Sequence, residues 1–302
     1  MAANGSTHST ESGDTRAGFL FALAAYLLWG FLPLYMKAVA HIPPAEVVAH
    51  RTVWSVPIAA AVILWIGRTA ELKAAIRDPR MLAQAVLTAT VLSVNWGLYV
   101  WAIGAGRALE TALGYYINPL FSIFLAFALL GERLRPLQYG AIGLALLAVL
   151  IVTWGEGVPW VSLALTFSWG FYAYFRRALP IGPNQGFLLE VLILLPIAIV
   201  YIAWAEINGQ GHFLIAPRES LLLMFSGVVT AVPLMLYANG AKLLRLSTIG
   251  VMQYIAPSMI FVIAIFLFEE PFNAARAVAF ALIWAALVLY SMSMFAGRTR
   301  GG

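Results

Sequence analysis

Charged residues and cysteines are scarce or missing in this 302-residue sequence. Only 10% of its residues are charged and none is cysteine, whereas a soluble domain has about 25% charged residues. A chain without cysteine has no thiolate metal site, no iron–sulfur cluster and no thiol nucleophile. The low charge, together with 62% hydrophobic residues, argues against an ordinary soluble enzyme and against a disordered chain. Most of the chain therefore belongs in a membrane.

Sequence motifs for catalysis are also missing. There is no H-E-x-x-H, G-x-S-x-G or P-loop pattern. The four histidines, at positions 8, 41, 50 and 212, lack the spacing of metal ligands. The net charge is +5, but no basic block with interleaved aromatic residues lies outside the apolar segments, which argues against nucleic-acid binding. We therefore expect no catalytic residues, no metal, no cofactor and no nucleic-acid partner.

Long apolar runs, in contrast, follow one another along the chain. A transmembrane helix needs about 20 apolar residues. Ten runs of about this length lie near 16–36, 45–66, 81–103, 109–130, 137–154, 158–175, 186–205, 220–240, 247–268 and 274–295. Most lack strict alternation and exceed the length of a barrel strand, so they predict helices. The predicted fold is an all-α integral membrane protein with ten transmembrane helices, a disordered tail at 1–15 and a short tail at 297–302.

Lysine and arginine are spread unevenly over the predicted connections. Thirteen of the 18 lie in the two tails and in every second connection, four lie in the other connections, and Arg51 lies inside a helix. Short cytoplasmic connections are rich in these residues. We therefore expect both tails in the cytoplasm and the helices in a bacterial inner membrane, and an even number of crossings agrees with this.

The two halves of the chain resemble each other. Trp29-Gly30-Phe31 recurs as Trp169-Gly170-Phe171, and Tyr116-Ile117-Asn118-Pro119 recurs as Tyr254-Ile255-Ala256-Pro257, at separations of 138 to 140 residues. The predicted repeats, 16–156 and 157–296, hold five helices each. Because five is odd, the second repeat enters the membrane from the opposite side. Inverted repeats of this kind are typical of secondary transporters, whose substrate site lies between the halves near the bilayer midplane.

Polar side chains within the predicted helices indicate where a central cavity lies. The third and fourth helices of both repeats carry polar residues at helical spacing, and such residues usually face a cavity or the bundle interior. With two tryptophans as apolar walls, the candidate substrate-binding residues are Asn95, Tyr99, Trp101, Tyr115, Asn118, Trp169, Tyr237 and Gln253. The alternative is that these groups only form hydrogen bonds between helices.

Two charged residues lie deep in their helices, at equivalent positions of the two repeats. Arg51 is a cation and Glu190 an anion, which makes them candidates for substrate binding or proton handling, with His50 as a further candidate proton carrier. The alternative is structural pairing, of Arg51 with an acid such as Glu46 and of Glu190 with Arg176 or Arg177. Protons are thus a candidate coupling ion.

Several short motifs together resemble the drug/metabolite transporter superfamily in its EamA-type branch, and within it the bacterial RarD group. They include Trp29-Gly30, His50-Arg51, Leu130-Gly131-Glu132-Arg133, Gln253-Tyr254-Ile255 and the run Gly114-Tyr115-Tyr116-Ile117-Asn118-Pro119-Leu120. The resemblance covers about 16–296. It implies a basket-like bundle around a central cavity and export of small metabolites, commonly amino acids and sometimes drug-like compounds. It implies no catalytic motif.

The sequence therefore favours a transporter that exports amino acids or similar metabolites by alternating access, and not an enzyme. A multidrug exporter of chloramphenicol-like compounds on the same scaffold is the first alternative. A broad, apolar, methionine-lined cavity would favour it. A membrane-embedded lipid-modifying enzyme is the second, and it would need Arg51 with Glu190 or His50 as an acid–base pair. A purely structural subunit is made improbable by the inverted repeat.

Overall fold

The computed structural model describes residues 14–131 and 133–296, and within these ranges it consists of helices and connections without a strand. The helices are α1 (Arg16–Ala38), α2 (Pro44–Ile66), α3 (Thr69–Arg77), α4 (Pro79–Gly104), α5 (Ala108–Leu130), α6 (Pro136–Glu156), α7 (Trp160–Ala178), α8 (Pro183–Ile207), α9 (Pro217–Ala241), α10 (Leu246–Met252), α11 (Ile255–Phe266) and α12 (Ala274–Ala296).

The two predicted tails lie outside the described residues, except for the last two positions of the first tail. Thr15 is the N-cap of α1 and accepts a hydrogen bond from Gly18 N at 3.0 Å. Asp14 accepts one from Arg245 N at 2.8 Å. The described part of the chain thus begins before the predicted boundary, and the ends of two helices supply donors for these two side chains.

Local sequence explains where several helices begin and end. Asp78 caps α4 by accepting a hydrogen bond from Arg80 N at 2.9 Å, and Pro79 follows at the first helical position, where no amide hydrogen is needed. Gly67 and Gly131 follow the ends of α2 and α5 with φ of 74° and 67°. Glycine adopts this left-handed conformation without the strain that a side chain would cause.

Nine spans in the described part of the chain are long and apolar enough to cross a membrane. The one predicted crossing not among these nine spans, at 158–175, is present as α7, but its polar residues make it less apolar than the others. These include Ser162, Thr166 and Ser168 on the helix and Arg176 and Arg177 in its last turn. An all-helical membrane protein is thereby confirmed, while the count of ten crossings stays a prediction.

Two features differ from ten uninterrupted helices. The ninth predicted helix is divided into α10 and α11 at Gln253 and Tyr254. A short helix, α3, lies between the second and third predicted crossings. With nine residues it is far below the roughly 20 that a crossing needs.

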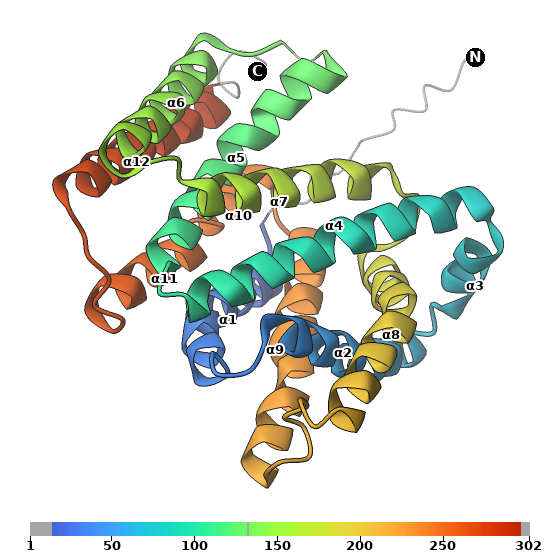
Figure 1. Ribbon diagram of the computed structural model, residues 1–302. Helices are drawn as coiled ribbons and strands as arrows, with labels where there is room; N and C mark the ends of the chain where they lie inside the picture. The colour runs from blue at the N-terminus through green and yellow to red at the C-terminus, as the bar shows by residue number, and fades with distance from the viewer. Residues whose placement is uncertain (1–13, 132, 297–302) are drawn as a thin grey trace, which may run out of the picture.

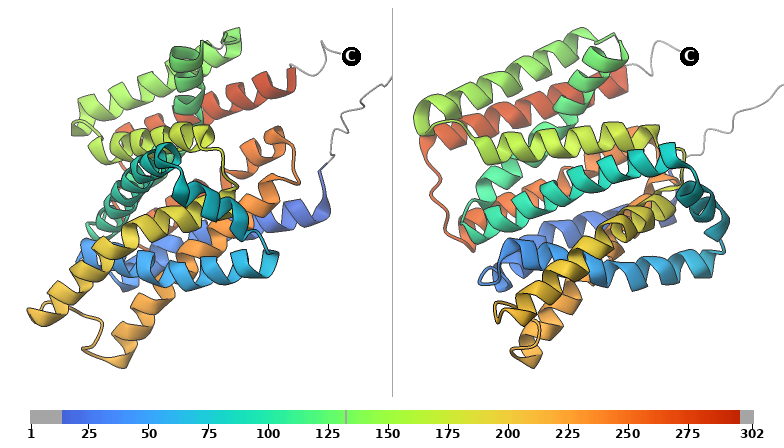
Figure 2. Two further views of the ribbon diagram at one scale, coloured as in Figure 1. Left: turned by 90° about the vertical axis from the view of Figure 1, so that its right-hand side faces the viewer. Right: turned by 45° about the vertical axis from the view of Figure 1, so that its right-hand side comes forward.

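Many of the helix contacts join the two halves of the chain. In the right-hand view of Figure 2 most long helices run broadly side by side, and α1 begins on the side where α12 ends. α1 packs on α9 and α11, and α7 packs on α4 and α5. α2 packs on α8 and α9, while α6 and α12 form a separate pair, seen at the upper left of Figure 1. The first helix of each half therefore contacts the third and fourth helices of the other.

Candidate functional site

A cavity of about 160 Å³ lies between the two halves. One water molecule needs roughly 10–15 Å³ on this measure, so the cavity has room for a small metabolite. Aromatic rings dominate its wall, with a few amides and one cation. The lining residues are Tyr26, Trp29, Leu32, Arg51, Asn95, Trp96, Tyr99, Tyr115, Asn118, Trp169, Thr230, Leu234, Tyr237, Gln253, Ala256, Pro257 and Ile260.

Most of the sequence-predicted residues meet at this cavity. Of the eight candidate substrate-binding residues, the structure brings together Asn95, Tyr99, Tyr115, Asn118, Trp169, Tyr237 and Gln253. They come from α4, α5, α7, α9 and the break between α10 and α11. Arg51, proposed from the sequence as a charge-handling residue, joins them from α2. That they bind a substrate stays a prediction, which the geometry permits.

Arg51 is buried at the wall of this cavity and contacts side chains of two other helices. Its side chain is buried, with 4% of the residue exposed. Nε donates a hydrogen bond to Thr230 Oγ1 of α9 at 2.9 Å, and the guanidinium lies over the ring of Trp96 at 4.8 Å from the ring centre. This is a cation–π contact, which fixes the plane of the guanidinium. Within the described residues Nη1 has no hydrogen-bond partner.

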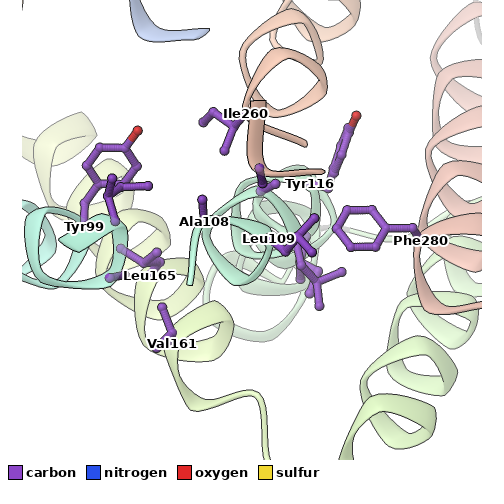
Figure 3. Close-up of a cluster of buried hydrophobic side chains, with 14 of the residues drawn as sticks. Tyr99, Ala108, Leu109, Tyr116, Val161, Leu165, Ile260 and Phe280 are labelled. Atoms are coloured by element: carbon purple, nitrogen blue, oxygen red, sulfur yellow. The ribbon is translucent and has the colours of Figure 1, made fainter. Parts of the chain in front are cut away.

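Aromatic pairs form two regions of the wall. Tyr99 and Tyr115 lie 5.8 Å apart between ring centres, and Tyr237 lies 5.8 Å from Tyr26 and 5.5 Å from Trp29. Figure 3 shows Tyr99 at the edge of the apolar cluster, with its hydroxyl pointing away from the side chains of Val161 and Leu165. That hydroxyl has no hydrogen-bond partner among the described residues. Such rings combine apolar faces with a polar end, and here the polar end of Tyr99 is unpaired.

The three amides of the wall differ in how far they are already bonded. Asn95 Nδ2 donates to Ser168 Oγ of α7 at 2.8 Å, and Gln253 Nε2 donates to Gly250 O at 3.0 Å. Asn118 Oδ1 has no partner within the part of the chain that the structure describes. Asn95 therefore joins two helices, as the alternative interpretation of the polar residues expected, while the side-chain oxygen of Asn118 keeps unused bonding capacity.

Trp101 was predicted to line the cavity and does not. Its ring packs at 5.2 Å from that of Trp160, and the Arg107 guanidinium lies 5.8 Å from its centre. Helical geometry gives the reason, since residues two apart point to different sides of a helix and Trp101 is two residues beyond Tyr99. Trp96, three residues before Tyr99, takes the place on the wall.

His50 and Glu190 also lie outside the cavity wall. His50 Nδ1 accepts a hydrogen bond from Trp54 Nε1 at 3.2 Å, and its ring stacks on Phe213 at 4.9 Å. Glu190 is fully buried, 3.6 Å from Arg176 Nε, and accepts a hydrogen bond from Tyr172 at 3.1 Å. The predicted pairing with Arg176 is present. The acid–base pair that a lipid-modifying enzyme would need is not assembled at the cavity.

The proposed partner of Arg51, Glu46, is engaged elsewhere. Glu46 accepts hydrogen bonds from His212 N at 2.6 Å and is paired with His212 Nδ1 at 2.8 Å. The alternative interpretation that paired Arg51 with Glu46 is therefore wrong. His212 lies in the α8–α9 connection, and sequence spacing alone does not show that this connection reaches the start of α2.

Sequence reasoning missed two further aromatic residues of the wall, Tyr26 and Trp29. A signal was present, because Trp29 is the repeat counterpart of Trp169, which was predicted. Tyr26 is three residues before Trp29 and shares its face of α1. Applying the repeat in both directions would have found them.

Comparisons with known proteins agree with this architecture. The sequence profile of the EamA-like transporter family matches residues 16–154. The chain is 39% identical over 285 residues to an uncharacterized transporter of Vibrio cholerae, covering 93% of this chain and 94% of the relative. It is 37% identical over 284 residues to Protein RarD of Escherichia coli strain K12, covering 93% and 96%. The chain belongs to the EamA-like transporter family.

A third relative and a solved structure add detail. The Chloramphenicol-sensitive protein RarD of Pseudomonas aeruginosa is 34% identical over 277 residues, covering 90% of this chain and 92% of the relative. A crystal structure covering 90% of this chain and 96% of its own matches with a TM-score of 0.59 at 21% identity, which supports the fold alone. This EamA-like transporter is thus a multi-pass membrane protein of a family that moves small molecules.

Proposed function

We propose that this EamA-like transporter exports small metabolites, amino acids foremost, across the bacterial inner membrane by alternating access. The observation that carries the proposal is the central cavity, whose wall is built by both halves of the chain and combines aromatic faces with unpaired polar groups. A site between two related halves is where alternating-access transporters bind their cargo.

The exchange of packing between the halves supports the mechanism. α1 packs on α9 and α11 as α7 packs on α4 and α5, which is the pattern that two inverted five-helix repeats, 16–156 and 157–296, would produce. The start of α1 and the end of α12 lie on one side (Figure 2), as expected for two cytoplasmic termini. Exchanging the conformations of the halves would turn the cavity from one side of the membrane to the other.

A counterflow assay tests the proposal. Proteoliposomes loaded with one unlabelled amino acid at a time should accumulate its labelled form. Tyr99→Ala and Tyr237→Ala should each lower the exchange rate about tenfold, because each removes an aromatic face and a hydroxyl worth roughly 1.5 kcal/mol or more of binding. Tyr139→Ala, on the exposed surface of α6, is the matched control and should exchange normally. Normal exchange by both cavity variants would place the site elsewhere.

Proton coupling is a second part of the proposal, with Glu190 as the group that takes up the proton. Its buried carboxyl has one oxygen without a hydrogen bond among the described residues, although Arg176 is near. Imposing a pH gradient should then drive uphill uptake, and Glu190→Gln should abolish the gradient effect while retaining exchange. Uphill uptake by Glu190→Gln, or no gradient effect in the unmodified protein, would contradict this role.

A multidrug exporter is the other candidate, because the cavity wall is mainly aromatic and one relative is named chloramphenicol-sensitive. The described wall has no methionine, which the sequence analysis took as a mark of such an exporter. Unlabelled chloramphenicol in the counterflow assay discriminates. Exchange of chloramphenicol without exchange of any amino acid would favour the drug exporter.

A further inference from the structure

Arg51 is the one charged side chain on the described cavity wall, and its positive charge has no acidic partner there. The two buried acids considered from the sequence are engaged elsewhere, Glu46 with His212 and Glu190 with Arg176. A buried cation without a counter-ion is costly, so it is normally paired. The charge of Arg51 therefore lies at the cavity wall without a negative partner on the described part of that wall.

The sequence repeat suggests why the described residues supply no counter-ion to Arg51. Glu190 has Arg176 as its partner, from the last part of α7. At the separation of 140 that relates Trp29 to Trp169, the counterpart of Arg176 in the first half is Met36, which carries no charge. To neutralise Arg51 as Arg176 neutralises Glu190, this position would have to carry an acid, and it carries an uncharged methionine.

The contacts of the guanidinium leave one of its nitrogens unpaired. Nε donates a hydrogen bond to Thr230 Oγ1, and Trp96 covers one face of the guanidinium plane. Nη1 is buried and without a partner among the described residues, as is the hydroxyl of Tyr99 on the same wall. A guanidinium fixed in this way has the planar donor geometry that matches a carboxylate. The surrounding rings provide apolar contacts for the rest of a ligand.

We propose that the cargo is a small carboxylate with an apolar or aromatic body, and that Arg51 binds its carboxylate. Since the described wall has no acidic side chain, an ammonium group is not what the site selects. Amino acids qualify through their carboxylate, and so do related acids without an amine. This inference rests on the proposed transport function and narrows its substrate class.

Three compounds that share a phenyl ring and differ in charge test the inference. They are L-phenylalanine, 3-phenylpropionate, which lacks the amine, and phenethylamine, which lacks the carboxylate. Binding to the purified full-length protein in detergent can be followed by tryptophan fluorescence, because Trp29, Trp96 and Trp169 lie on the cavity wall. We expect both carboxylates to bind and phenethylamine to bind at least tenfold more weakly.

Variants of Arg51 provide a second, independent test of carboxylate binding. Arg51→Gln should lower the affinity for both carboxylates at least tenfold, and Arg51→Lys should restore part of it, because the charge returns without the planar donor pair. Arg68→Gln removes an exposed arginine from the connection between α2 and α3 and is the control, with unchanged affinity expected. If Arg51→Gln does not fold, the compound series with the unmodified protein decides alone.

The outcomes separate this inference from the proposed function. Phenethylamine binding as tightly as 3-phenylpropionate, or unchanged carboxylate affinity in a folded Arg51→Gln, overturns the role of Arg51. Counterflow of chloramphenicol without binding of either carboxylate also overturns it, while transport stands. Absence of exchange for every amino acid and for chloramphenicol, in vesicles that contain folded protein, removes the proposed function and this inference with it.

Discussion

Two carboxylates, Glu270 and Asp14, cap the starts of two helices that lie far from them in the sequence. Glu270 accepts hydrogen bonds from Ala108 N at 2.5 Å and Leu109 N at 2.8 Å, at the start of α5. Asp14 accepts one from Arg245 N at 2.8 Å, immediately before α10. The first amides of a helix have no partner within it, so these contacts satisfy them and also join the halves.

Removing the Glu270 carboxylate should therefore destabilise the protein. Glu270→Ala leaves two buried amides without an acceptor, and loss of such a cap costs about 1–2 kcal/mol. We expect a lower melting temperature in detergent, measured by tryptophan fluorescence. Glu269→Ala changes the neighbouring exposed carboxylate and should melt close to the unmodified protein. Equal melting temperatures for the two variants would show that the cap contributes little.

Glu270 also gives the stability a pH dependence. Burial raises the pKa of this carboxyl above its ordinary value of 4.5, although the amides of Leu109 and Ala108 oppose the shift. The fold thus favours the protonated form, so this contribution to stability is complete below pH 4.5 and is lost as the pH rises through the raised pKa.

Glu270→Gln cannot ionise at this position, so its stability should lack the contribution of this carboxyl to the pH dependence. As the pH is raised from 4.5 toward neutrality, the unmodified protein should lose stability relative to Glu270→Gln. Melting temperatures at a series of pH values measure the difference. Two parallel curves would mean that Glu270 does not titrate in this way.

At the scale of helices, the contact between α2 and α9 depends on the absence of a side chain at one position. A Cβ atom added to Gly227 would lie 2.3 Å from the carbonyl carbon of Trp54 and 2.4 Å from its oxygen. Neither backbone atom moves without moving α2. Small residues permit such close approach of helices in membranes, and here the approach brings Thr230 of α9 to Arg51 of α2.

Gly227→Ala should therefore separate the two helices and cost about 1–3 kcal/mol. It should lower the melting temperature and weaken ligand binding, because the hydrogen bond between Arg51 and Thr230 would be strained. Gly97→Ala is the matched control, since an added Cβ at this helical position of α4 meets nothing within 4 Å. It should be neutral or slightly stabilising, because alanine is the better helix former. Similar melting temperatures for both variants would contradict the close-contact argument.

At the scale of the whole molecule, the inverted repeat predicts opposite sides for equivalent connections. Ala105 lies in the connection between α4 and α5, and Lys242 lies in the corresponding connection between α9 and α10. Both are exposed. If the second half is inverted, Ala105 faces outward and Lys242 faces the cytoplasm.

The absence of cysteine makes this testable with single substitutions. Ala105→Cys should react with a membrane-impermeant maleimide in intact cells, whereas Lys242→Cys should react only after the membrane is permeabilised. The unmodified protein provides the unlabelled background, since it has no cysteine. Labelling of both variants from the same side would rule out the inverted arrangement.

Much of the architecture and most of the candidate site follow from periodicity. The apolar runs predicted the helices, and helical spacing placed Tyr115 and Asn118 on one face of α5, where the structure has them on the cavity wall. Trp101 was placed on the wall because it is close to Tyr99 in the sequence. Residues two apart point to different sides of a helix, so the same spacing rule argues against that placement. The division between α10 and α11 was also missed, since both pieces are apolar and the change in direction leaves no strong composition signal.

The sequence by itself determined that this chain enters a membrane, that it does so as helices, and which faces of those helices are polar. These are consequences of hydropathy and local geometry, which each segment carries alone. Only the tertiary structure decided what each polar face meets. Arg51 and Glu190 are equivalent positions in the predicted repeat, yet Glu190 is paired with Arg176 while Arg51 lies on the cavity wall. The difference arises because the energy of a charge in a low-dielectric interior depends on the groups next to it. Those groups come from other helices, and the sequence around the charge does not show them.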